Sequence, residues 1–185
     1  MRLGIFNFIF IVLLTNFTPL YASVYDDDVL EIFSKILPRF VLMSDQKTKI
    51  QDEIKICILH DALDKRSALS LIDKVNANYP NGLKNYKISF AHDNYENIDS
   101  CNESQLIFLF NSSDNNIADA LLYAQKQHAL NISYDAKLLK SGVEISLFLG
   151  RKIVPYINIK ALQRNGVELD NVLLRISKIY TERDQ

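Results

Sequence analysis

The chain has 185 residues, with 21 basic and 22 acidic side chains and a formal net charge of −1 at neutral pH. A balance this close to neutral gives no electrostatic basis for binding nucleic acid or an anionic membrane, so we expect neither as a partner. The length suits one domain with a sizeable hydrophobic core.

The first 22 residues have the pattern of an export signal. Arg2 supplies a positive start, residues 5–14 form an apolar run, and Ala22 offers a small residue for cleavage. The alternative is an uncleaved anchor, which needs about 20 apolar residues to cross a bilayer. Pro19 and its polar neighbours interrupt the run well short of that. We therefore expect cleavage near Ala22, which leaves residues 23–185 as a single domain in the periplasm.

The mature chain begins with a predicted helix. Three carboxylates, Asp26 to Asp28, suit the exposed amides and the dipole at a helix start. Behind them, apolar residues recur at helical spacing, and Pro38 is expected to kink or end the helix near Leu37. The polar segment 43–53 then predicts a loop.

Two apolar runs are predicted as central strands. Residues 54–60 are apolar on both faces, which favours a strand covered by helices on both sides. Residues 106–110 are apolar without a break. Between them, the sequence predicts an amphipathic helix over 61–78 and, from its period-two alternation, an edge strand over 86–90. A polar loop is expected over 91–104.

The second half predicts a third helix from Ser113 to about His128 and a short strand over 130–134. Strands alternating with helices indicate a parallel sheet with right-handed crossovers. Residues 143–149 and 153–159 then predict an antiparallel hairpin, followed by a helical turn and a last helix whose apolar stripe runs from Leu169 to Ile179. The predicted fold class is α/β, a three-layer or two-layer sandwich with a parallel βαβ core, a C-terminal antiparallel β-hairpin and a closing helix.

Few residues suggest chemistry. His60-Asp61 at a strand end is the one pair that could perform acid–base catalysis, and the alternative is that Asp61 caps the next helix. His92 and His128 are scattered, without cysteine or carboxylate at metal-ligand spacing. No glycine-rich phosphate cradle and no nucleophile motif is found. We therefore expect no catalytic residues, no cofactor and no metal, and a protein that is not an enzyme.

The two cysteines, Cys57 and Cys101, are 44 positions apart, each associated with one of the two central strands. In an exported domain two cysteines are expected to pair as a disulfide. The alternative is two buried free thiols.

Five short patterns carry a resemblance to a known family. They are Lys55-Ile56-Cys57-Ile58-Leu59, Cys101 with Leu106–Phe110, Ser141-Gly142-Val143, Tyr156-Ile157-Asn158-Ile159 and Leu173-Leu174. In this order and spacing they resemble the YfiR-like family of small periplasmic proteins, over most of the mature chain. One glycine, Gly142, stands where that family usually has two, and four residues separate Cys101 from its strand.

The resemblance implies a regulator that is a homodimer. It implies that the protein binds the periplasmic sensor domain of a membrane diguanylate cyclase and holds the cyclase inactive, so that cyclic di-GMP rises when repression is lost. The competing interpretation is a periplasmic small-ligand-binding module that serves a different membrane sensor or transporter. Neither interpretation identifies a partner-binding surface.

Overall fold

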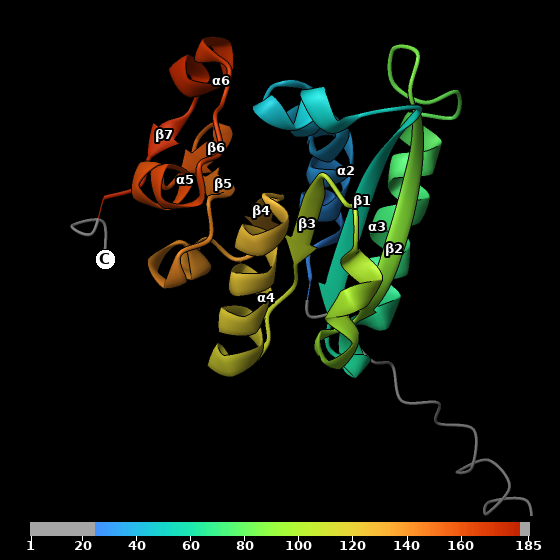
Figure 1. Cartoon of the computed structure of the whole chain (residues 1–185), viewed down its shortest axis with the longest axis horizontal. Helices are drawn as coiled ribbons and strands as arrows, with labels where there is room; N and C mark the ends of the chain where they lie inside the picture. The colour runs from blue at the N-terminus through green and yellow to red at the C-terminus, as the bar shows by residue number, and fades with distance from the viewer. Residues whose placement is uncertain (1–24, 182–185) are drawn as a thin grey trace, which may run out of the picture.

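The computed structural model describes residues 25–181, and its labels follow Figure 1. The expected leader, residues 1–22, lies outside the described residues. The described part forms one sheet with the strand order β2-β1-β3-β4-β5-β6-β7. The strands are β1 (Glu53–His60), β2 (Lys87–Asn94), β3 (Leu106–Leu109), β4 (Leu130–Ser133), β5 (Ile145–Leu149), β6 (Ile153–Ile157) and β7 (Lys178–Ile179).

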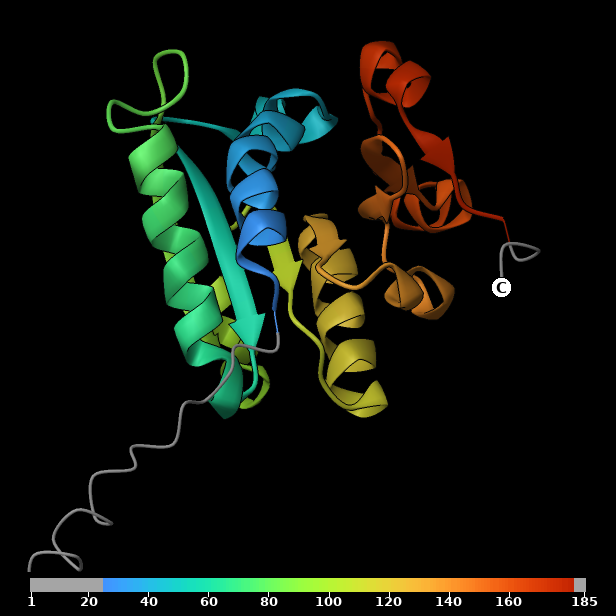
Figure 2. The same ribbon diagram turned by 180° about the vertical axis from the view of Figure 1, so that it is seen from behind.

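Helices cover both faces of this sheet (Figures 1 and 2). The helix α2 (Asp27–Leu42) and the helix α3 (Lys65–Asn78) pack on one face, and α4 (Asp114–Gln127) packs on the other. Two short helices, α5 (Ile159–Asn165) and α6 (Asn171–Ile176), accompany the C-terminal strands. The shorter 3-10 helices are η1 (Asp45–Lys49), η2 (Ala62–Asp64), η3 (Tyr95–Cys101) and η4 (Ala136–Ser141). The α/β fold is confirmed, in its three-layer form.

β1 is central because both of its faces are apolar. Ile54, Ile56 and Ile58 pack toward α2 and α3, whereas Cys57 and Leu59 pack toward α4. All five side chains have no exposed surface. Since side chains alternate along a strand, β1 contributes to both core layers at once, as its sequence predicts.

The C-terminal hairpin is also confirmed. β5 and β6 pair antiparallel, from Ile145 opposite Ile157 to Leu149 opposite Ile153. The other pairs between β1 and β5, namely β2 with β1, β1 with β3, β3 with β4 and β4 with β5, are parallel. Within residues 25–181, no helix is both long enough and apolar enough to cross a membrane.

The boundaries of three predicted elements are wrong. Helix α2 continues through Pro38 to Leu42, because Phe40 and Val41 beyond the proline are buried in the core. The expected loop 91–104 instead contains the end of β2, which reaches Asn94, and then η3. The expected loop 43–53 contains η1 and the first residue of β1.

The closing helix is shorter than its apolar stripe predicts. α6 ends at Ile176, and Ile179 lies in β7, where it pairs with Ile157 of β6. Of the stripe, only Leu173 is fully buried, whereas Val172 and Ile176 are each 55% exposed. The stripe is therefore not the buried face of one helix. Its last residue, Ile179, pairs within the sheet, whereas Val172 and Ile176 are exposed on α6.

Candidate functional site

The structure does not bring His60 and Asp61 together as a catalytic pair. His60 is buried, and its Nδ1 lies 2.8 Å from the backbone carbonyl oxygen of Asp61. The carboxylate of Asp61 instead accepts a hydrogen bond from Ser112 Oγ at 2.7 Å. Asp61 stands at the N-cap position of η2, but its side chain makes no capping hydrogen bond. The capping interpretation is therefore wrong as well, because Asp61 ties the end of β1 to the segment after β3.

The place where parallel sheets usually bind ligands is filled by the chain itself. In a sheet of order 2-1-3-4-5, that place is the crevice at the carboxyl ends of β1 and β3. Tyr25 lies there: its hydroxyl donates to Asp64 Oδ2 at 3.1 Å and accepts from the Asn111 backbone N–H at 3.0 Å. Its ring packs against Phe110 and Tyr134. Burial raises the pKa of the Tyr25 hydroxyl, which therefore stays neutral.

His60 and His92 stack near the same edge, with ring centroids 5.9 Å apart. His60 Nε2 and His92 Nδ1 are buried and have no hydrogen-bond partner within residues 25–181. Over the same range, no group of three or more His, Cys, Asp or Glu side chains is placed to hold a metal ion. The stack therefore provides no metal site among these residues.

Cys57 and Cys101 are joined by a disulfide, with their Cα atoms 5.2 Å apart. Both residues have no exposed surface. The bond joins the middle of β1 to the end of η3, which precedes β3, on the α4 side of the sheet.

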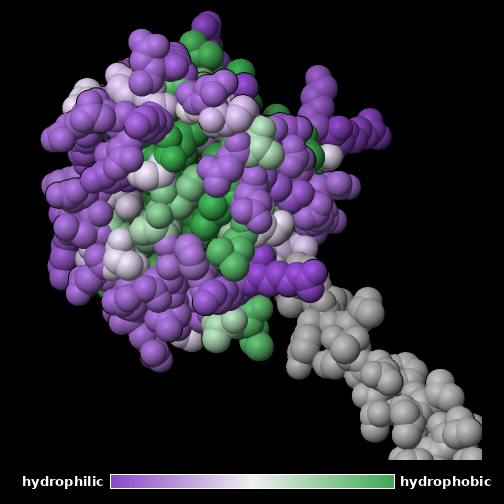
Figure 3. Space-filling model, turned by 90° about the vertical axis from the view of Figure 1, so that its right-hand side faces the viewer, coloured by the Kyte–Doolittle hydropathy of each residue, from purple (hydrophilic) through white to green (hydrophobic). Residues whose placement is uncertain are grey.

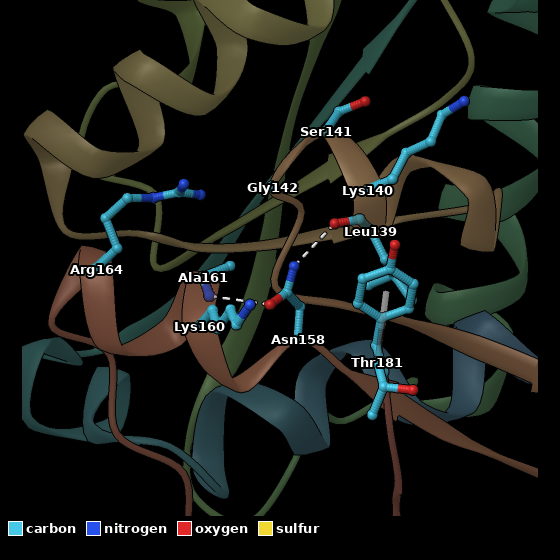
Figure 4. A pocket seen from close by; sticks show the side chains of 10 residues that line it. Leu139, Lys140, Ser141, Gly142, Asn158, Lys160, Ala161, Arg164 and Thr181 are labelled. Carbon is cyan, nitrogen blue, oxygen red and sulfur yellow. Dashed lines mark hydrogen bonds between the residues drawn. The ribbon is translucent and has the colours of Figure 1, made fainter. Parts of the chain in front are cut away.

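A cavity of about 940 Å³ opens beside the C-terminal hairpin (Figure 4). Three cationic side chains line it, from η4 and α5, together with polar groups and no carboxylate of the described residues. The cations are Lys140, Lys160 and Arg164. Asn158 shapes the floor, because its amide donates to the Leu139 carbonyl oxygen at 2.8 Å and accepts from the Ala161 N–H at 3.1 Å.

Gly142 allows Arg164 to enter this cavity. Gly142 has φ of +109°, which side chains rarely tolerate, and a Cβ there would lie 2.6 Å from an Arg164 guanidinium nitrogen. Figure 4 shows the Arg164 side chain reaching toward Gly142. The sequence did not reveal this cavity, because its cations are divided between two elements, η4 and α5, and form no motif.

A buried carboxylate, that of Glu144, lies two residues after Gly142 in the sequence. Glu144 Oε2 accepts from the Asn131 N–H and Oε1 accepts from Asn165 Nδ2, each at 2.8 Å, so Glu144 ties β4 to α5. Burial raises the pKa of Glu144 to about 7, although these hydrogen bonds and the nearby Arg164 oppose the shift. The alternating pattern around Glu144 predicted a strand but not its burial.

Apolar side chains are exposed mainly on the C-terminal elements. Within residues 25–181, six of the nine large apolar side chains with high exposure lie on the β5–β6 hairpin, α6 and β7. We call these six the C-terminal apolar surface: Phe148, Leu149, Ile153, Val172, Ile176 and Ile179. Lys178 Nζ lies 3.9 Å from the centroid of the Phe148 ring, which adds a cation–π contact beside the surface. Exposed apolar side chains on neighbouring elements are a common feature of interaction sites.

The fold defines a three-layer α/β domain with a buried disulfide and a polar crevice closed by its own tyrosine. The chain belongs to the YfiR/HmsC-like family, whose family model matches residues 33–178. Proteins of this family are periplasmic regulators in cyclic di-GMP signalling rather than enzymes, and they are associated with membrane sensors.

Two solved structures share the fold. One is a conserved domain protein from Vibrio cholerae, with a TM-score of 0.56, 11% identity and 82% of this chain covered. The other is an ABC domain in complex with L-Trp from Streptococcus pneumonia, with a TM-score of 0.53, 10% identity and 80% of this chain covered. This chain covers 60% of each of those chains. At such identities the likeness concerns the fold alone. A search among curated proteins finds no match.

Proposed function

We propose that this protein is exported, loses its leader near Ala22, and binds the periplasmic sensor domain of a membrane diguanylate cyclase, which it holds inactive. The observation that carries the proposal is the family match over residues 33–178. The Cys57–Cys101 disulfide supports it, because disulfides form and persist in oxidising compartments such as the periplasm.

The C-terminal apolar surface is the region that we assign to the cyclase. Exposed apolar side chains contribute to binding when a partner removes them from water, and a few central residues usually dominate the affinity. Ile176 is suited to this role because it is 55% exposed on α6, beside the equally exposed Val172. A charge at Ile176 would be buried without a counter-charge in the complex.

Deletion of the gene is expected to raise cyclic di-GMP in cells that express the cyclase. Wild-type protein should restore the low level, whereas Ile176→Asp should not, because its affinity for the sensor domain falls about thirtyfold or more. Cyclic di-GMP is measured by mass spectrometry of cell extracts. The matched control is Leu122→Asp on α4, where the leucine is 51% exposed but lies outside the C-terminal apolar surface.

The control variant should repress as well as the wild type, and circular dichroism should show both variants folded. Unchanged cyclic di-GMP in the deletion strain would refute the cyclase as target. Equal loss of repression in both variants would refute the assigned surface.

A second candidate function is a small-ligand-binding module, which the cavity beside Gly142 favours. Arg164 and Lys140 line it without a described carboxylate, so the ligand that fits is a small anion. The solved ABC domain with L-Trp shares the fold at a TM-score of 0.53. In this reading the protein would deliver a ligand signal to a membrane sensor or transporter.

Citrate and inorganic phosphate are expected to bind at this cavity if the second function holds. Arg164→Ala should weaken the binding about tenfold or more, because a hydrogen bond to a charged group is lost. Isothermal titration calorimetry measures the affinity, with Arg151→Ala in the hairpin turn as the exposed arginine control. Absence of heat with both anions, or equal weakening by both variants, would contradict this function.

A further inference from the structure

We propose that β2 is a homodimerisation edge, at which two copies of this chain pair their β2 strands antiparallel across a two-fold axis and form one continuous sheet. The inference does not depend on the cyclase as target. It gives a surface to the homodimer that the family resemblance implies, which otherwise stays a prediction.

The two edges of the sheet differ in what they offer. β7 is two residues long, which leaves little backbone for another strand to pair with. β2 is eight residues long, pairs with β1 in unbroken register from Lys87 to Asn94, and lies at the end of the strand order. Its outer row of backbone N–H and C=O groups therefore has no strand partner in residues 25–181. A long edge of this kind is a template for strand addition.

The centre of β2 also lacks the features that usually protect an edge. It contains no proline, and its central residues, Ile88 to His92, carry no formal charge with histidine neutral. Ile88 and Phe90 are only partly buried against the core beneath. Figure 3 shows the face that carries β2 and α3, where apolar surface gathers in a central hollow within a polar rim. A second protein chain that covered this surface would remove its apolar groups from water.

The charges of β2 favour a second copy of the same strand. In an antiparallel pair centred on Phe90, Lys87 lies directly opposite Asp93 of the second copy, and the two-fold axis repeats this contact. Ser89 then lies opposite Ala91, and the two Phe90 rings meet at the axis. Moving the centre by one residue removes both ion pairs. The strand is therefore complementary to itself in one register.

Both charges are placed for this contact. Lys87 is exposed and forms no ion pair with another described residue. The Asp93 carboxylate is held by the Asn94 N–H at 2.8 Å and by Asn97 Nδ2 at 2.5 Å. These hydrogen bonds lower the pKa of Asp93, so the carboxylate is ionised at neutral pH.

Charge exchange tests this register. Lys87→Asp and Asp93→Lys should each raise the dimer Kd of the full mature protein about tenfold or more, since each places like charges opposite one another. The double variant Lys87→Asp/Asp93→Lys should restore the wild-type Kd, because the pairs are re-formed with reversed sign. Analytical ultracentrifugation measures the Kd, and Lys152→Asp in the hairpin turn is the control.

Hydrogen–deuterium exchange supplies a second measurement that needs no variant. Amides of residues 87–94 should exchange more slowly in concentrated than in dilute wild-type protein. A wild-type protein that stays monomeric at high concentration would overturn the proposal. A dimer Kd that neither single substitution changes would also overturn it. So would a double variant that dimerises as weakly as the single variants although its circular dichroism spectrum is native.

Discussion

Replacing Cys57 or Cys101 by serine is expected to lower the free energy of unfolding by about 4 kcal/mol, because the bond closes a loop with a sequence separation of 44. Without the bond, the unfolded chain gains the conformational freedom that the loop had lost. For a domain of this size the melting temperature should fall by roughly 8–16 °C. The loss is a large share of the ~5–15 kcal/mol that stabilises a typical domain.

The double variant Cys57→Ser/Cys101→Ser should be no less stable than either single variant, since one bond is lost in each case. Thermal unfolding followed by circular dichroism gives the comparison. Thiol labelling of the denatured, unreduced wild type provides the decisive check: two reactive thiols would show that no bond forms in the folded protein in solution.

Stability should also fall as the pH rises through neutrality, because of Glu144. Burial raises its pKa from 4.5 in the unfolded chain to about 7, so the folded state holds the proton more firmly between these values. The contribution of Glu144 is therefore fully present below about pH 4.5 and is lost as the pH rises through 7. The loss amounts to about 3 kcal/mol, on the order of 1.4 kcal/mol for each pH unit of the shift.

Glu144→Gln should remove this pH dependence, because the amide stays neutral and can still meet Asn131 and Asn165 after the Asn165 side chain turns over. Urea unfolding at pH 5, 6, 7 and 8 gives the free energy for both proteins, and their difference isolates Glu144 from other titrating groups. Glu144→Ala should be destabilised at every pH, since it leaves the Asn131 N–H buried without an acceptor. Parallel profiles for the wild type and Glu144→Gln would contradict the shifted pKa.

The central part of the fold could be predicted because its signals are local. The strands around Ile56 and Phe108 are apolar on both faces, and no other common element has that pattern at that length. The helix after Ser113 was equally clear, since Ser113 Oγ caps it by accepting from the Asn116 N–H. The parallel pairing of β1, β2, β3 and β4 was indicated by the alternation of strands and helices.

The missed features depend on contacts between distant residues. Pro38 is tolerated in α2 because the surrounding helix is held by the core, which a local breaker signal does not reveal. Ile179 joins β7 because the edge of β6 is available to it. Glu144 is buried because Asn131 and Asn165 satisfy its oxygens, and these residues lie 13 and 21 positions away. Arg164 reaches its cavity only because Gly142 has no side chain.

Cys57 and Cys101 are completely buried, so their disulfide responds slowly to a change in the redox state of the solvent. Reduction requires a thiolate to approach one of the two sulfurs, and the folded domain leaves no such approach. A reductant therefore reacts only with molecules in which η3 has lifted from the sheet or the domain has unfolded, so the small population of such open molecules slows the reduction. The disulfide that formed under oxidising conditions therefore persists for as long as the domain stays closed, even after the surroundings become reducing.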